Sequence, residues 1–164
     1  MAFGRFSSQD ALTARDDVLL ETVGYIKGVN HLGYDRQEQP VKYGKDAQAL
    51  AARIDGVLKA EAKTGQPMSD DERTLLTKTY AALGQVAETS NRYGILRRTD
   101  EQGARRAAQV EFRDFRRDMD RLAHNVYVDG FVGRYESPGS GRPLTATQEA
   151  EVGRIEWNSN PNIR

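Results

Sequence analysis

One apolar stripe constrains the fold of this chain more than any other feature of its sequence. Between Thr99 and Val128, apolar residues recur with spacings of four, three, four, three and four, at Ala108, Phe112, Phe115, Met119, Leu122 and Val126. Because an α-helix has about 3.6 residues per turn, this spacing gathers the side chains on one side of a helix. The sequence therefore predicts one long amphipathic helix that packs on its neighbours through this stripe.

The opposite side of the predicted helix carries Arg106, Arg113 and Arg117. From position 92 to 121, nine arginines stand against six acidic residues, within a chain whose net charge is zero. Guanidinium groups suit phosphates and carboxylates. However, acidic residues are interleaved at helical spacing, as in Asp114 with Arg117, which is typical of a solvated helix surface. Three interpretations stay open for this side: a salt-bridged surface, an acidic protein partner, and nucleic acid.

Further helices are predicted on both sides of the long one. Start signals, in which a Ser or Thr precedes an acidic residue or Gln by three positions, occur at Ser7, Ser69, Thr99 and Thr145. Apolar spacing predicts a first helix that ends between Gly28 and Gly33, and a second from about 45 to 63. A third runs from 69 to about 94, and a short last helix from 145 to about 157. The segment 31–43 is predicted to be a connector, and Gly65 is placed to end the second helix in a left-handed conformation.

These elements predict an all-α fold: a bundle of about four main helices with a Gly/Pro-hinged C-terminal arm and a short terminal helix. We expect residues 1–128 to form the bundle and residues 129–164 the arm. Positions 129–143 hold four glycines and two prolines, which is typical of a loop. A short strand over 126–132 is the one alternative to helix and loop there.

Aromatic residues on the predicted arm are candidates for contact with a partner. Phe131, Tyr135 and Trp157 lie in or after the glycine-rich segment. An aromatic side chain on an arm suits a groove on a neighbouring molecule. The alternative is that the arm folds back and covers its own bundle.

The sequence argues against several classes of protein. The chain has no cysteine, which excludes disulfides, thiol catalysis and cysteine-ligated metals. His31 and His124 do not stand in a metal-binding or catalytic motif, and the glycine-rich segment 138–143 lacks the Lys-Ser/Thr ending of a P-loop. We therefore predict no enzyme, no cofactor and no metal site. With no signal peptide and no apolar run near 20 residues, we expect a cytoplasmic or virion location and no membrane contact.

The function that suits these features is a non-enzymatic structural component of a larger multi-protein assembly. Its partners would be further copies of the chain, as a homo-oligomer, or neighbouring assembly subunits, since zero net charge leaves little repulsion between copies. By analogy of architecture, a phage virion protein such as a head–tail adaptor or connector subunit is one form. The alternative is a nucleic-acid-associated or regulatory protein that uses the arginine side of the long helix. The expected interaction surface comprises Arg106, Arg113, Arg117, Phe131, Tyr135 and Trp157.

Overall fold

Every regular element in the described part of the chain is helical, which confirms the predicted all-α class. The structure, a computed structural model, describes residues 7–30, 40–96 and 101–159. In chain order the elements are α1 (Ser8–Ile26), α2 (Pro40–Lys59), a 3₁₀ turn η1 (Glu61–Thr64), α3 (Asp70–Leu96), α4 (Glu101–Tyr127), a π-helical turn η2 (Val128–Val132), α5 (Gly133–Glu136) and α6 (Ala146–Ser159). Among these residues, no helix has the length and apolar character needed to cross a membrane.

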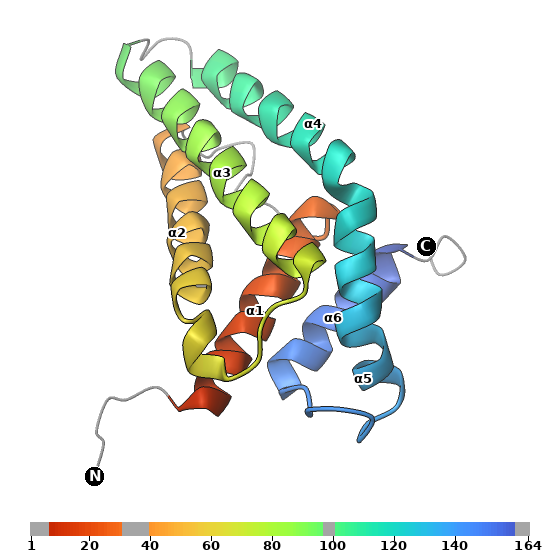
Figure 1. Ribbon diagram of the computed structural model, residues 1–164. Helices are drawn as coiled ribbons and strands as arrows, with labels where there is room; N and C mark the ends of the chain where they lie inside the picture. Colours follow the sequence, from red (N-terminus) through yellow and green to blue (C-terminus); the bar gives the residue numbers. More distant parts are fainter. Residues whose placement is uncertain (1–6, 31–39, 97–100, 160–164) are drawn as a thin grey trace.

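The helices pack as a bundle around α1. Figure 1 shows α2 and α3 side by side, α4 against α3, and α6 beside the lower part of α4. Helix α1 contacts α2, α3, α4, α6 and η1, so it is the element that joins the two halves of the bundle. The fully buried side chains of the core come from all the long helices and include Leu19, Val23, Leu50, Ile54, Leu75, Leu83, Ala123, Phe131, Val152 and Ile155.

Local capping signals set where the helices begin. The backbone N–H of Asp10 donates to the Ser7 hydroxyl (3.0 Å), and the backbone N–H of Ser7 donates to the Asp10 carboxylate (3.3 Å). The same reciprocal bonds join Ser69 to Glu72 and Thr145 to Gln148. These three predicted capping boxes are confirmed, and each satisfies two backbone donors that would otherwise lack a partner. The fourth, at Thr99, lies outside the described residues.

The predicted helix ends need three corrections. Helix α1 ends at Ile26, earlier than expected, because Gly28 takes a left-handed φ of 80°. Helix α2 begins at Pro40, inside the predicted connector, since a proline needs no N–H partner in the first turn. Helix α3 continues to Leu96 rather than stopping near position 94. Gly65, with a φ of 68°, has the predicted left-handed conformation.

The largest correction concerns the predicted hinge and its alternative strand. Residues 126–136 form neither a loop nor a strand, because α4 continues through the π turn η2 into α5 and ends at Glu136. The loop is confined to positions 137–145, where Gly139 has a positive φ of 96°. Helix α6 then packs back against α1 and buries Val152 and Ile155 completely. The described part of the predicted arm is therefore packed on the bundle, as the fold-back alternative expects.

An ion pair fixes η1 to the start of α3. Both oxygens of the Glu61 carboxylate accept bonds from the Arg73 guanidinium, at 2.7 and 2.6 Å, and one also accepts the backbone N–H of Met68 at 2.7 Å. The bonds from Arg73, and then the bond from Met68, hold the pKa of Glu61 below its ordinary value of 4.5. The charged form of Glu61 is therefore the form that the fold stabilises.

The substitution Glu61→Gln should lower the stability of the protein at neutral pH and have no effect in acid. A carboxylate whose pKa is lowered on folding contributes stability above its unfolded pKa of 4.5, and loses it as the pH falls through the lower folded pKa. Thermal unfolding from about pH 7 to about pH 3 should show the gap between wild type and variant closing with falling pH. Asp120→Asn, at an exposed carboxylate on α4, is the control and should show a smaller gap. A gap that stays constant with pH would contradict this role for Glu61.

Candidate interaction surface

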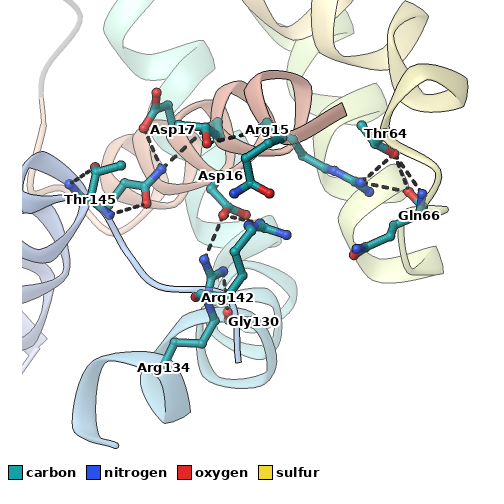
Figure 2. Close-up of polar contacts among 12 residues, drawn as sticks. Arg15, Asp16, Asp17, Thr64, Gln66, Gly130, Arg134, Arg142 and Thr145 are labelled. Atoms are coloured by element: carbon teal, nitrogen blue, oxygen red, sulfur yellow. Dashed lines mark hydrogen bonds and ion pairs between the residues drawn. The ribbon is translucent and has the colours of Figure 1, made fainter. Parts of the chain in front are cut away.

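Asp16 is a buried carboxylate that receives two arginines from the C-terminal segment. Its side chain is 7% exposed, and the Arg134 Nη2 donates to its Oδ2 at 2.9 Å. Arg142 Nη2 donates to the same oxygen. Arg134 also donates to the backbone oxygens of Arg142 (2.7 Å) and Gly130 (3.3 Å). Figure 2 shows the two guanidinium groups meeting at Asp16 from α5 and from the loop that follows. This cluster ties both segments to α1.

The residues on either side of Asp16 hold two other parts of the chain. The buried Arg15 turns the opposite way and donates to the Thr64 hydroxyl (2.9 Å) and to the Gln66 carbonyl (2.7 Å) (Figure 2). Asp17 accepts a bond from the Gln148 amide of α6 at 2.9 Å. Three consecutive residues of α1 therefore bind η1 and its following turn, the α5 region, and α6.

Phe131 lies in the core and not on the surface. Its side chain is 1% exposed, and the Arg134 guanidinium stacks over its ring, 5.5 Å from the ring centre. The π turn η2 adds a residue to the helix at this point, which carries Phe131 inward and presents Arg134 to Asp16. We therefore do not keep Phe131 among the residues available to a partner.

A second polar contact attaches α6 to the end of α4. The buried Tyr127 hydroxyl donates to the Glu156 carboxylate at 2.6 Å. Burial first, and then this hydrogen bond, raise the pKa of Tyr127 well above its ordinary value of 10.0. The hydroxyl therefore stays protonated over the physiological range and remains a donor to Glu156.

Tyr135 and Trp157 remain exposed, and they lie on the same part of the molecule. Trp157 is 55% exposed and Tyr135 is 39% exposed. The Tyr135 hydroxyl lies 3.5 Å from the position that a Cβ would occupy at Gly153. Trp157 follows Gly153 by four residues on α6, which places the two positions on one side of that helix. Tyr135 of α5 and Trp157 of α6 form what we call the aromatic edge.

The arginine side of α4 is exposed, and acidic neighbours partly neutralise it. Arg113 lies 3.8 Å from the Asp114 carboxylate, and Arg117 lies 3.8 Å from Asp114 and 3.3 Å from Asp118. The predicted i,i+3 pair between Asp114 and Arg117 is therefore present. The side chain of Arg106 lies outside the described residues. Arg116 instead turns inward and donates to the Ile26 carbonyl at the end of α1 (3.3 Å).

The histidine and carboxylate groups show no arrangement for metal binding in the part of the chain that is described. No group of three or more His, Cys, Asp or Glu side chains lies there in a position to bind an ion. His124 is exposed, with its Nδ1 3.3 Å from the Lys27 ammonium, and His31 lies outside the described residues.

A separate feature is an open groove of about 970 Å³ between α2 and α3, whose lining includes the exposed Tyr80.

Comparisons with known proteins add no relative. Neither the models of protein families, nor the curated proteins, nor the solved structures include a match to this chain.

The Asp16 cluster was not anticipated from the sequence, although a signal was present. The apolar positions of the first helix pass from Leu12 to Leu19 without an apolar residue at 15 or 16, where the helical spacing calls for one. Charged residues at such core positions are expected to be paired when buried.

The substitution Asp16→Asn should destabilise the protein and loosen the C-terminal segment in particular. It keeps the side-chain shape and leaves two partly buried guanidinium groups without their carboxylate, at a cost of about 3 kcal/mol. For a chain of this size, Tm should fall by roughly 6 to 12 °C. Trypsin should also cleave after Arg134 faster in the variant, because α5 is no longer held to α1 by Asp16.

The matched control is Asp118→Asn, at a side chain that is 68% exposed and paired only across the surface of α4. It should change the free energy of unfolding by less than about 1 kcal/mol. Equal effects of the two substitutions would contradict the assigned role of Asp16.

Proposed function

We propose that this protein is a non-enzymatic interaction component of a multi-protein assembly, and that the aromatic edge contacts its partner. The observation that carries the proposal is the exposure of Trp157 and Tyr135 on one side of α6. Trp and Tyr are the side chains most often found at the energetic centre of protein interfaces. Their large rings bury much apolar surface area in an interface, and this area stays in contact with water when the ring is exposed.

The aromatic edge lies on a helix that is firmly attached to the bundle, which supports a binding role. Helix α6 is fixed to α1 by the buried side chains of Val152 and Ile155 and by the hydrogen bond from Gln148. It is fixed to α4 by the hydrogen bond between Glu156 and Tyr127. A side chain held on a fixed element loses less conformational entropy on binding than one on a free segment. A polar rim adjoins the edge, since the exposed Arg154 bonds to Glu151 and to Asn30, each at 2.9 Å.

The kind of assembly is a separate question. A head–tail adaptor or connector subunit of a phage virion was suggested by analogy with helical bodies that extend an arm onto a neighbour. Because residues 146–159 pack on the bundle, that analogy now rests on the chain's small size and its helical fold. We therefore propose partners of two kinds, a second copy of the chain and a neighbouring subunit of the same assembly.

The nucleic-acid alternative is less well supported by the geometry. A surface that binds phosphates needs arginines whose charge is not already offset. Arg113 and Arg117 each lie within 4 Å of an aspartate. The arginine side of α4 therefore resembles a solvated, salt-bridged helix surface more than a phosphate-binding one.

The single tryptophan makes the proposal directly testable. Trp157 is the only Trp in the chain, so its fluorescence reports the aromatic edge alone. Its emission should shift to shorter wavelength when the protein self-associates or binds a subunit encoded by a neighbouring gene. Light scattering should show the matching increase in mass. Trp157→Ala and Tyr135→Ala should each weaken that association, by about 30-fold for the Trp change, as expected for about 2 kcal/mol at an interface centre.

The matched control is Tyr80→Ala, which removes an aromatic side chain of similar exposure from α3, away from the edge. It should leave the association unchanged. A protein that stays monomeric and binds no such subunit, or a loss with Tyr80→Ala as large as with Trp157→Ala, would contradict the proposal.

A further inference from the structure

Carboxylates surround the aromatic edge. Glu136 directly follows Tyr135 and is exposed. Burial of Tyr127, its hydrogen bond to Glu156, and the nearby Tyr135 and Glu136 all raise the pKa of Tyr127. Glu136 and Glu156 therefore lie on the same part of the molecule as Tyr135.

A third carboxylate stands on α6. Glu149 is exposed and precedes Glu156 by seven residues, so the two lie on one side of the helix, two turns apart. Glu149 is also one turn before Gly153, over which the Tyr135 hydroxyl lies. The two rings of the aromatic edge and these three carboxylates, Glu136, Glu149 and Glu156, form what we call the acidic aromatic surface.

The positive charges of this part of the chain are bound within the molecule. Arg134 and Arg142 both bind Asp16, and Arg154 bonds to Glu151. By contrast, the three carboxylates of the acidic aromatic surface form no ion pair with any lysine or arginine among the described residues. The surface is therefore negative, although the chain as a whole has no net charge.

We propose that the acidic aromatic surface binds a basic segment of a neighbouring subunit, with an arginine of that segment stacked on Trp157. This inference rests on the proposed function, because it names the chemistry of the partner at the same surface. A guanidinium is planar, so it can stack on an aromatic ring while it donates to a carboxylate. The compact ammonium of a lysine makes the ion pair but lacks the planar stacking. The exposed Trp157, with carboxylates beside it that have no ion pair, therefore suits arginine best.

A second copy of the chain is a less suitable partner. A two-fold interface uses the same surface on both copies, so the carboxylates of one copy would face those of the other. A head-to-tail contact would need the exposed arginines of α4, but Arg113 and Arg117 already lie within 4 Å of an aspartate. Of the two kinds of partner, the charge of the surface favours the neighbouring subunit.

Peptide titration of the full chain, followed by the fluorescence of Trp157, tests the inference. The probes are three blocked peptides in which alanine alternates with arginine, lysine or glutamate. The arginine peptide should change the Trp157 emission and bind about three-fold more tightly than the lysine peptide, because of the stacking. The glutamate peptide should not bind. Equal affinities for the arginine and lysine peptides, binding of the glutamate peptide, or no binding of the arginine peptide would overturn the inference.

Charge variants locate the binding site of the arginine peptide. Glu136→Gln with Glu149→Gln should weaken binding about five-fold, through the loss of two exposed ion pairs. The matched control, Asp118→Asn with Asp120→Asn, removes the same charge from exposed positions on α4 and should weaken binding by less than about two-fold. Equal weakening by the two pairs would show that the peptide responds only to net charge, and would overturn the inference.

Charge reversal gives an independent measurement at the same positions. Glu136→Lys with Glu149→Lys changes only exposed side chains and should keep the helical content of wild type by circular dichroism. This variant should bind the glutamate peptide more tightly than the arginine peptide. An unchanged preference for arginine would overturn the inference.

The results with a real partner separate this inference from the proposed function. If a subunit encoded by a neighbouring gene needs Trp157 but binds the glutamine pair as well as wild type, the proposed function stands and the basic partner is wrong. If the chain self-associates through Trp157 and Arg113→Glu with Arg117→Glu abolishes this, the partner is a second copy and the inference is again wrong. A subunit whose binding is weakened by both Trp157→Ala and the glutamine pair would support both.

Discussion

The burial of Asp16 between two arginines is the interaction on which the arrangement of the C-terminal segment depends. A carboxylate out of water is costly unless it is paired and hydrogen-bonded, so α1 holds this residue only where Arg134 and Arg142 reach it. Both arginines come from residues more than one hundred positions later in the chain. With Arg15 and Asp17 binding on either side, one turn of α1 determines where η1, α5 and α6 lie. Removing one partner of such a buried ion cluster is costly, because the charges that remain lose their partner.

The parts of the fold that depend on local chemistry could be predicted from the sequence. The capping boxes at Ser7, Ser69 and Thr145 and the left-handed Gly65 are short-range effects, and the structure shows each of them. The stripe along α4 follows from periodicity, and Phe112, Met119 and Val126 are buried as it requires. The local propensities of residues gave a wrong prediction where tertiary contacts determine the backbone conformation. The glycines of 130 and 133 are typical of a loop, yet Phe131 and Arg134 hold this stretch in a helix through burial and the contact with Asp16.

The candidate surface could be predicted only in part, because it too depends on tertiary contacts. The sequence marks Trp157 and Tyr135 as aromatic residues outside the main stripe. That Tyr135 of α5 lies beside the side of α6 that carries Trp157 depends on the π turn and on the return of the chain to α1. A signal for that turn exists in the sequence. The spacing of three or four residues along the stripe places the next apolar residue after Val126 at position 129 or 130. Phe131 stands one position beyond 130. A π turn accommodates that extra residue. The proposal of an interaction component thus rests on α6 being a fixed part of the body.

Native-state hydrogen exchange tests that claim most directly, because it measures the free energy of opening for each helix separately. If α6 is integral to the bundle, the amides of Val152 and Ile155 should exchange as slowly as those of Leu19 and Val23 in α1. Added denaturant should then reveal one common opening of α1 and α6. Exchange of the α6 amides many orders of magnitude faster than those of α1, at a rate near that of an unfolded peptide, would contradict the account.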